Sequence, residues 1–172
     1  MGLLHGLPNR MVVQAFKHVP WLASRWAKSH QFVEGRDIPW TPLSKPVAES
    51  VIALVTTAGV HLKSQEPFDM DDPDGDPSFR EIPSDARKED LTITHKYYDH
   101  SAADRDINVV LPLDRMREFV AGGRIRGVAP VVYGFMGHIH GRHLARLLAE
   151  SAPEVARRLK SDGADAVVLT PA

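Results

Sequence analysis

Apolar and polar positions along the chain predict strands that alternate with helices. Residues 50–62 form an almost continuous apolar, β-branched run, which is typical of a strand buried on both faces of a parallel sheet. Shorter runs predict strands at 91–95, at 107–112 and at 125–135, the last in two pieces around Pro130. The sheet is therefore expected to be largely parallel.

Helical periodicity separates these strands. Residues 113–123 predict one helix, and residues 141–163 predict either two helices or one kinked helix, with Ser151 and Glu154 as a capping box in the first case. A final strand follows at 164–169, and we expect it near the centre of the sheet. The pattern indicates a layered α/β fold of the Rossmann or flavodoxin-like kind, with an N-terminal helical arm.

The first 40 residues differ from the rest of the chain. They carry basic but no acidic residues up to position 30, and two short amphipathic helices broken at Pro20 are expected. We predict an arm and a proline-rich linker over 1–40, followed by an α/β domain over 41–172. An arm that docks on its own domain or on a second subunit is preferred to a membrane-surface helix.

Composition narrows the function classes. The 172 residues have a net charge of −1, 43% hydrophobic residues and no cysteine. A nucleic-acid partner is not expected, and disulfides, thiolate metal sites and a cysteine nucleophile are excluded within this sequence. No apolar run is long enough to span a bilayer and the start fits a secretory signal poorly, so we expect a cytoplasmic, oligomeric protein.

Residues 63–90 form a long acidic segment rich in proline, glycine and serine. Its aspartates resemble a calcium loop around Gly75, but Met70 stands where that loop needs its first carboxylate. The segment is instead predicted to be a solvated loop that folds over a pocket.

The segment "ITHKYYDHS" is the strongest candidate for chemistry. A strand that runs into His95, Tyr98 and Asp99 gathers titratable groups at its end, where a carboxylate could orient an imidazole for proton transfer. A simple capped strand end explains the pattern equally well.

A second histidine group offers a weaker alternative. His138, His140 and His143 could bind zinc or iron, although a Gly- and His-containing segment at a helix start needs no metal. No phosphate-binding glycine loop and no serine elbow is present.

Five segments taken together resemble the selenoprotein B family of the glycine, sarcosine, betaine and D-proline reductases. They are "ALVTTAGVHLKSQEPFD", "GDPSFREIP", "LTITHKYYDHSAADRDINVVLPLDRM", "VAPVVYGFMGHI" and "LKSDGADAVVLTP", in unbroken order from about Trp40 to the end. The resemblance implies a reductase that cleaves a C–N bond in a small amine or amino-acid-like substrate.

The resemblance also implies a redox residue immediately after this sequence. In the family, the strand that ends in Thr-Pro leads into selenocysteine or cysteine. Selenocysteine is encoded by UGA, so we expect it just after Ala172 and no cofactor within the chain. A pyruvoyl group on a partner subunit and a thiol or dithiol reductant are further implied partners.

Roles for individual residues follow from the same resemblance. The expected substrate-pocket residues are Thr56, Thr57, Gly59 and His61. The expected catalytic residues are His95, Tyr98 and Asp99, held from behind by Asp106 and Asn108. Two other functions stay open at this point: a non-catalytic scaffolding paralogue, and a hydrolase or lyase that uses a histidine-bound metal.

Overall fold

The computed structural model describes residues 9–29 and 40–172. These residues form two compact units: one contains the arm helices and residues 96–99, and the other contains the rest of 43–172. The arm consists of α1 (Asn9–His18) and α2 (Pro20–Ser29), and the predicted break at Pro20 is confirmed. Residues 30–39, which include the start of the predicted linker, lie outside the described residues.

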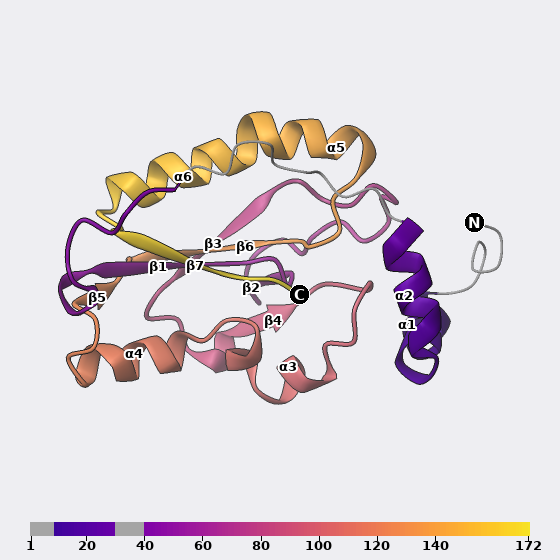
Figure 1. Ribbon diagram of the computed structural model, residues 1–172, viewed down its shortest axis with the longest axis horizontal. Coiled ribbons are helices and arrows are strands. Elements are labelled where there is room, and N and C mark those ends of the chain that lie inside the picture. Colours follow the sequence, from indigo (N-terminus) through magenta and orange to yellow (C-terminus); the bar gives the residue numbers. More distant parts are fainter. Residues whose placement is uncertain (1–8, 30–39) are drawn as a thin grey trace. The chain divides into compact units, whose positions relative to one another are not determined.

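One five-stranded sheet organises the larger unit (Figure 1). Its strands are β1 (Val51–Thr56), β3 (Phe79–Pro83), β5 (Gly127–Val128), β6 (Val131–Phe135) and β7 (Ala166–Thr170). β5, β6 and β7 all run parallel to β1, and β3 runs antiparallel to β6. The predicted α/β fold with a largely parallel sheet is confirmed, while its Rossmann or flavodoxin-like character stays a prediction.

The predicted two-piece strand around Pro130 is confirmed. The first piece, β5, pairs with the start of β1, and the second piece, β6, pairs with its end. Between them Ala129 N donates to Ile52 O, while the Pro130 carbonyl accepts from Ser84 N. Proline supplies no donor, so the ladder breaks there.

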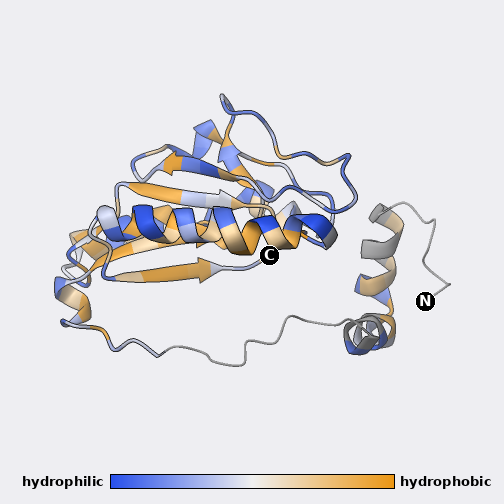
Figure 2. Ribbon diagram, turned by 90° about the horizontal axis from the view of Figure 1, so that it is seen from above, coloured by the Kyte–Doolittle hydropathy of each residue, from blue (hydrophilic) through white to orange (hydrophobic). Residues whose placement is uncertain are grey.

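Helices cover both faces of the sheet (Figure 1). α4 (Leu113–Ala121) lies on one face, and a long helix lies on the other, made of α5 (Gly141–Arg146), a π-helical turn (Leu147–Ser151) and α6 (Ala152–Ser161). Figure 2 shows apolar residues gathered on the strands. The core under α6 combines its two inward side chains with β1 and β6 residues: Ala53, Val55, Tyr133, Phe135, Val155 and Leu159.

The apolar run 50–62 is two strands and not one. β1 ends at Thr56, and β2 (Val60–Leu62) pairs antiparallel with β4 (Leu91–Ile93) in a separate two-stranded sheet. Gly59, with φ +72°, turns the chain between β1 and β2. The apolar pattern continues because both strands are buried, so it hides the turn.

Three further local predictions were wrong. Residues 107–112 contain a short 3-10 helix, Ile107–Val109, because the Asp106 side chain caps it at Asn108 N. The acidic segment contains β3, whose charged residues hide its strand character. Ser151 is no helix N-cap, because the helix passes through it without a break.

The last strand lies at the edge of the sheet and not at its centre. Gly163, with φ +74°, closes α6 as expected, and β7 then pairs with β1 alone among the described strands. The remaining short elements are the 3-10 helices Val47–Glu49 and Lys88–Asp90 and the helix α3 (Ser101–Arg105). In the described residues, no helix has the length and apolar character needed to cross a membrane.

Candidate functional site

The candidate site lies where β1 and β7 reach their carboxyl ends. Thr57 N and Thr56 Oγ1 both donate to the Thr170 carbonyl, at 3.1 and 3.3 Å, and Ala172 N donates to Thr57 Oγ1 at 3.3 Å. The Thr170 hydroxyl donates to Val110 O at 2.7 Å. These four bonds fix the course of the backbone as it leaves β7.

His95 lies beside this chain end. A Cβ placed on Gly137 would be 3.1 Å from the Ala172 carbonyl oxygen and 3.4 Å from His95 Nε2, and only 2.8 Å from Thr57 O. Three groups from different parts of the chain therefore surround the same point, and glycine leaves the space open. The carboxyl ends of strands in open α/β sheets are where ligands bind.

Burial makes the His95 imidazole less basic. Its side chain is 7% exposed. This desolvation, assisted by the nearby charges of His138 and His100, lowers the pKa of His95 to about 4. The ring is uncharged at neutral pH, and an anion placed next to it would favour its protonated form.

Gly59, His61 and Thr94 support His95. Gly59 O accepts from Thr94 N at 2.9 Å, and a Cβ on Gly59 would be 2.4 Å from Thr94 O, so the two segments approach as only glycine allows. His61 is buried, and its Nδ1 lies 2.8 Å from Leu62 O. A carbonyl can only accept, so Nδ1 carries a proton, and Nε2 lies 2.8 Å from the Thr94 hydroxyl.

The four residues predicted to line the substrate pocket lie in one region of the structure, and each makes different contacts. Thr56 and Thr57 hold the chain end, Gly59 allows the close approach, and His61 contacts Thr94. Binding of substrate by these four residues stays a prediction.

Asp106 and Asn108 brace the loop that receives the end of β7. Asp106 Oδ1 accepts from Asn108 N and Nδ2 at 3.0 and 2.8 Å, and these bonds lower the pKa of Asp106. The Asn108 side chain also donates to Asp114 Oδ2 and accepts from Asp114 N, both at 3.0 Å. The loop between Asn108 and Asp114 carries Val110, whose carbonyl accepts from the Thr170 hydroxyl.

Tyr98 and Asp99 belong to the unit that contains the arm. Within that unit, Asp99 Oδ2 lies 2.9 Å from Lys17 Nζ. Their predicted catalytic roles beside His95 therefore stay predictions.

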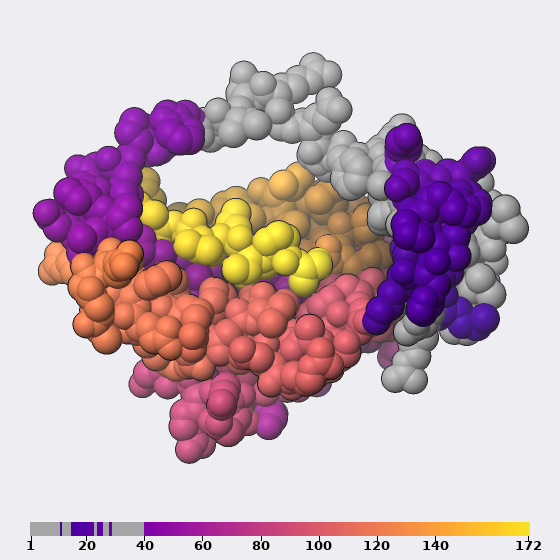
Figure 3. All heavy atoms as spheres, turned by 60° about the horizontal axis from the view of Figure 1, so that its bottom comes forward, coloured from indigo at the N-terminus to yellow at the C-terminus, as the bar shows by residue number. Residues whose placement is uncertain are grey.

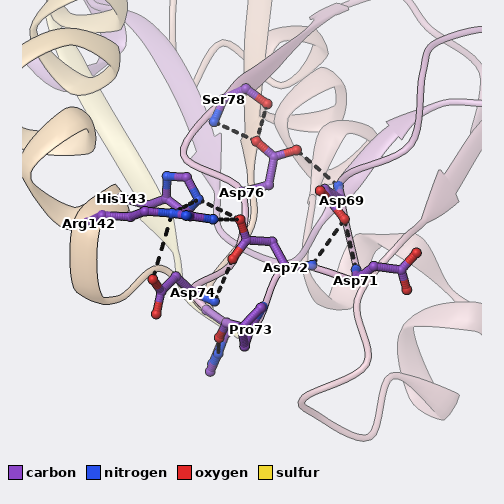
Figure 4. Close-up of polar contacts among 10 residues, drawn as sticks. Asp69, Asp71, Asp72, Pro73, Asp74, Asp76, Ser78, Arg142 and His143 are labelled. Carbon is purple, nitrogen blue, oxygen red and sulfur yellow. Dashed lines mark hydrogen bonds and ion pairs between the residues drawn. The ribbon is translucent and has the colours of Figure 1, made fainter.

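The other histidine group contacts the acidic loop (Figure 4). His143 Nε2 lies 2.9 Å from Asp72 Oδ2, which Arg142 also contacts, and His138 Nε2 lies 3.1 Å from Pro73 O. The hydrogen bond from His143 is the main reason why the pKa of Asp72 is well below its usual range. Within 9–29 and 40–172, no group of three or more His, Cys, Asp or Glu side chains is arranged to hold a metal ion.

Sequence reasoning missed three residues of this site. Gly137 leaves space between His95 and Ala172, the Thr94 hydroxyl contacts the His61 imidazole, and the Thr170 hydroxyl anchors the end of β7. Gly137 stood in a glycine-containing segment that lacked a phosphate-binding pattern, and nothing in one sequence indicated its neighbours.

Comparisons with known proteins find reductases of one family. The sequence model of the glycine/sarcosine/betaine reductase selenoprotein B family matches residues 26–172. The D-proline reductase subunit gamma of Acetoanaerobium sticklandii is 43% identical over 131 residues, which cover 76% of this chain and 52% of that protein. No solved structure matches the chain.

Two further relatives are also named as subunits of reductase complexes. The glycine reductase complex component B subunit gamma of Carboxydothermus hydrogenoformans is 33% identical over 138 residues, covering 77% of this chain and 30% of the relative. The betaine reductase complex component B subunit beta of Peptoclostridium acidaminophilum is 30% identical over 135 residues, covering 73% and 29%. The chain thus spans about half the length of the first relative and less than a third of the other two, and it belongs to the glycine/sarcosine/betaine reductase selenoprotein B family.

Proposed function

We propose that this chain is the substrate-facing part of a reductase-complex subunit that cleaves the C–N bond of a small amine or amino-acid-like substrate. The family match and the names of the relatives support the reductase-complex role. The observation that carries the proposal is the meeting of the β7 end with His95 around Gly137. A residue attached to Ala172 would start within reach of that imidazole.

The redox residue is proposed to be a selenocysteine, or a cysteine in its place, at the position after Ala172. Such a group would supply a selenolate or thiolate nucleophile. The greater length of all three relatives supports a longer form of the chain. A pyruvoyl group on a partner subunit and a dithiol reductant complete the proposed system.

His95 is proposed to hold and move the proton. Its pKa of about 4 means that it is neutral before an anion is present. A negative charge beside Nε2 would raise that pKa, so the proton would be available when the leaving amine needs it. Thr56, Thr57 and Thr170 act as positioning residues, because their hydrogen bonds set where the chain emerges.

The first test is to read the gene beyond codon 172. An in-frame TGA followed by an open frame is expected, and TAA or TAG at that place would reject the proposed redox residue. The longer form, produced with its partner subunits and a dithiol, is then assayed for reductive C–N cleavage, measured as amine release from glycine, sarcosine and betaine and as ring opening of D-proline. Turnover of none of them would contradict the proposed activity.

The second test addresses His95 in that longer form. We expect His95→Gln to lower kcat by about 10²-fold or more while KM changes much less, because proton transfer contributes about this factor. His143→Gln is the matched control, since His143 contacts the acidic loop. An unchanged kcat in His95→Gln would remove the proton role, and loss of activity in His143→Gln together with loss of bound zinc or iron would favour a metal enzyme instead.

A further inference from the structure

The exposed edge of the sheet has the residues of an interior strand. Val167 and Val168 are 42% and 41% exposed and Leu169 is 69% exposed, so β7 is apolar on both faces. Such a strand is typical of parallel sheets that are covered on both sides. Figure 3 shows β7, in yellow, at the surface.

An apolar hollow lies on one side of this edge. Register places Val167 opposite Ala53 and Leu169 opposite Val55, so both side chains face the layer of α6. Together with α6 they line a hollow of about 420 Å³, to which Ala152, Val155, Ala156 and Leu159 contribute. The two alanines are exposed and small, which allows another helix to approach closely.

The topology indicates what fits this hollow. The chain leaves β6, passes through α5 and α6, crosses β1 and enters the sheet as β7. A connection from β7 to a new parallel strand on its free edge would continue in the same direction across the sheet. Crossovers between parallel strands are right-handed, so the connecting helix must lie on the same face as α6. That is the face with the hollow.

We propose that this edge and hollow receive the next helix and strand of the longer form of the chain, the segment that follows Ala172. The inference rests on the proposed function in requiring that segment, and the length of the relatives supports it: this chain accounts for 52% of the first and about 30% of the others. The helix packs against Ala152, Ala156, Val167 and Leu169, and the strand pairs parallel to β7.

This arrangement also accounts for the place of the candidate site. The connection after β1 leads to α4 on one face, and the connection after β7 would lead to the other face. The carboxyl ends of β1 and β7 then form the point at which the winding reverses, where open α/β sheets bind ligands. Thr56, Thr57 and Thr170 meet at that point.

Amide hydrogen exchange of residues 166–170 tests the inference. It is measured in the chain of 172 residues and in the longer form, with a cysteine codon replacing the in-frame TGA. We expect exchange to be slower by about tenfold or more in the longer form, because the edge amides gain partners. Residues 79–83 of β3, at the opposite edge, are the internal reference and should not change.

A pair of variants tests the hollow itself. Ala156→Arg should leave the folding of the 172-residue chain unchanged, since Ala156 is exposed there. In the longer form it should return exchange of β7 to the rate of the short chain. Ala121→Arg, at an exposed position of α4, is the matched control and should have no effect on β7.

The outcomes separate this inference from the proposed function. Unprotected β7 in a longer form that reduces substrate would overturn the inference alone, and protected β7 without reductase activity would overturn the proposed function alone. The absence of an open frame after codon 172 would overturn both. Protection of β7 in a dimer of the 172-residue chain would make a second copy the occupant and would also overturn the inference.

Discussion

The two edge strands of the sheet, β3 and β7, differ in residue type and in what covers them. β3 exposes Glu81 and Pro83, carries Arg80 at an intermediate position and is anchored by Ile82, which is fully buried. Arg80 also donates to the carbonyls of Glu66 and Pro67, which places the acidic loop along this strand. Charge, proline and a covering loop are features by which proteins prevent further strand pairing.

β7 has none of these features between Ala166 and Thr170. Its side chains before Thr170 are apolar and partly exposed, and its pairing is with β1 alone among the described strands. The difference teaches that residue type and cover, and not strand length, distinguish the edges, because both strands have five residues.

The largest expected effect is a difference in the free energy of unfolding between substitutions in β3 and in β7. Ile82→Ala should lower the free energy of unfolding by about 2–5 kcal/mol, because it removes a fully buried side chain and leaves a cavity. Val168→Ala in β7 should cost about 1 kcal/mol or less, since that side chain is 41% exposed. Urea denaturation measures both, and equal losses would remove the distinction.

The next effect is a pH dependence at the carboxyl end of β7. His95 has a folded pKa of about 4 and a reference value of 6.5, so the unfolded chain binds more protons between these pH values. Stability should therefore be complete above pH 6.5 and fall as the pH is lowered toward 4, by at most about 3 kcal/mol before solvent screening reduces it.

His95→Gln should remove this dependence, and His18→Gln, at an exposed position of α1, should keep it. Urea denaturation at pH 7 and pH 5 provides the comparison. An unaltered slope in His95→Gln would show that another group titrates.

A smaller effect concerns association. Leu169→Lys should change the free energy of unfolding by about 0.5 kcal/mol or less, because the side chain is largely exposed. It should reduce self-association of the 172-residue chain in light scattering, since a charge at a sheet edge discourages pairing. Unchanged self-association of the Leu169→Lys variant would mean that β7 is not the surface through which the chain associates.

The smallest effect lies at the β3 edge. Glu81 and Arg158 form an ion pair between two partly exposed side chains. Glu81→Gln should lower the free energy of unfolding by less than any of the changes above, and the loss should disappear in high salt because exposed pairs are screened. A loss that persists in 1 M salt would show that packing is responsible.

The sequence predicted the general fold better than the limits of individual elements. Continuous apolar runs identified β1, β6 and β7, and the break at Pro130 followed from its missing donor. The same rule failed at β3, where two charged residues, one proline and one aromatic residue surround one fully buried residue, Ile82. Edge strands carry few core residues, so periodicity is a weak signal for them.

For the candidate site, the sequence indicated residue types but not their geometry. Thr56, Thr57 and His95 were identified from strand ends and from a family resemblance, and hydrogen bonds or close contacts bring them to one region. Gly137 and Thr170 were missed because their importance depends on which distant segments face them. The edge position of β7 was missed because an apolar strand alone does not reveal its number of neighbours.

Glycines such as Gly134 and Gly59 restrict how far this sequence can vary. A Cβ on Gly134 would be 2.1 Å from Val60 O, and one on Gly59 would be 2.4 Å from Thr94 O. Both obstacles are main-chain atoms, which no change of side chain elsewhere can remove. In a saturation library, these two positions should accept glycine alone, whereas Gly127, with no neighbour within 4 Å of its Cβ position, should accept alanine.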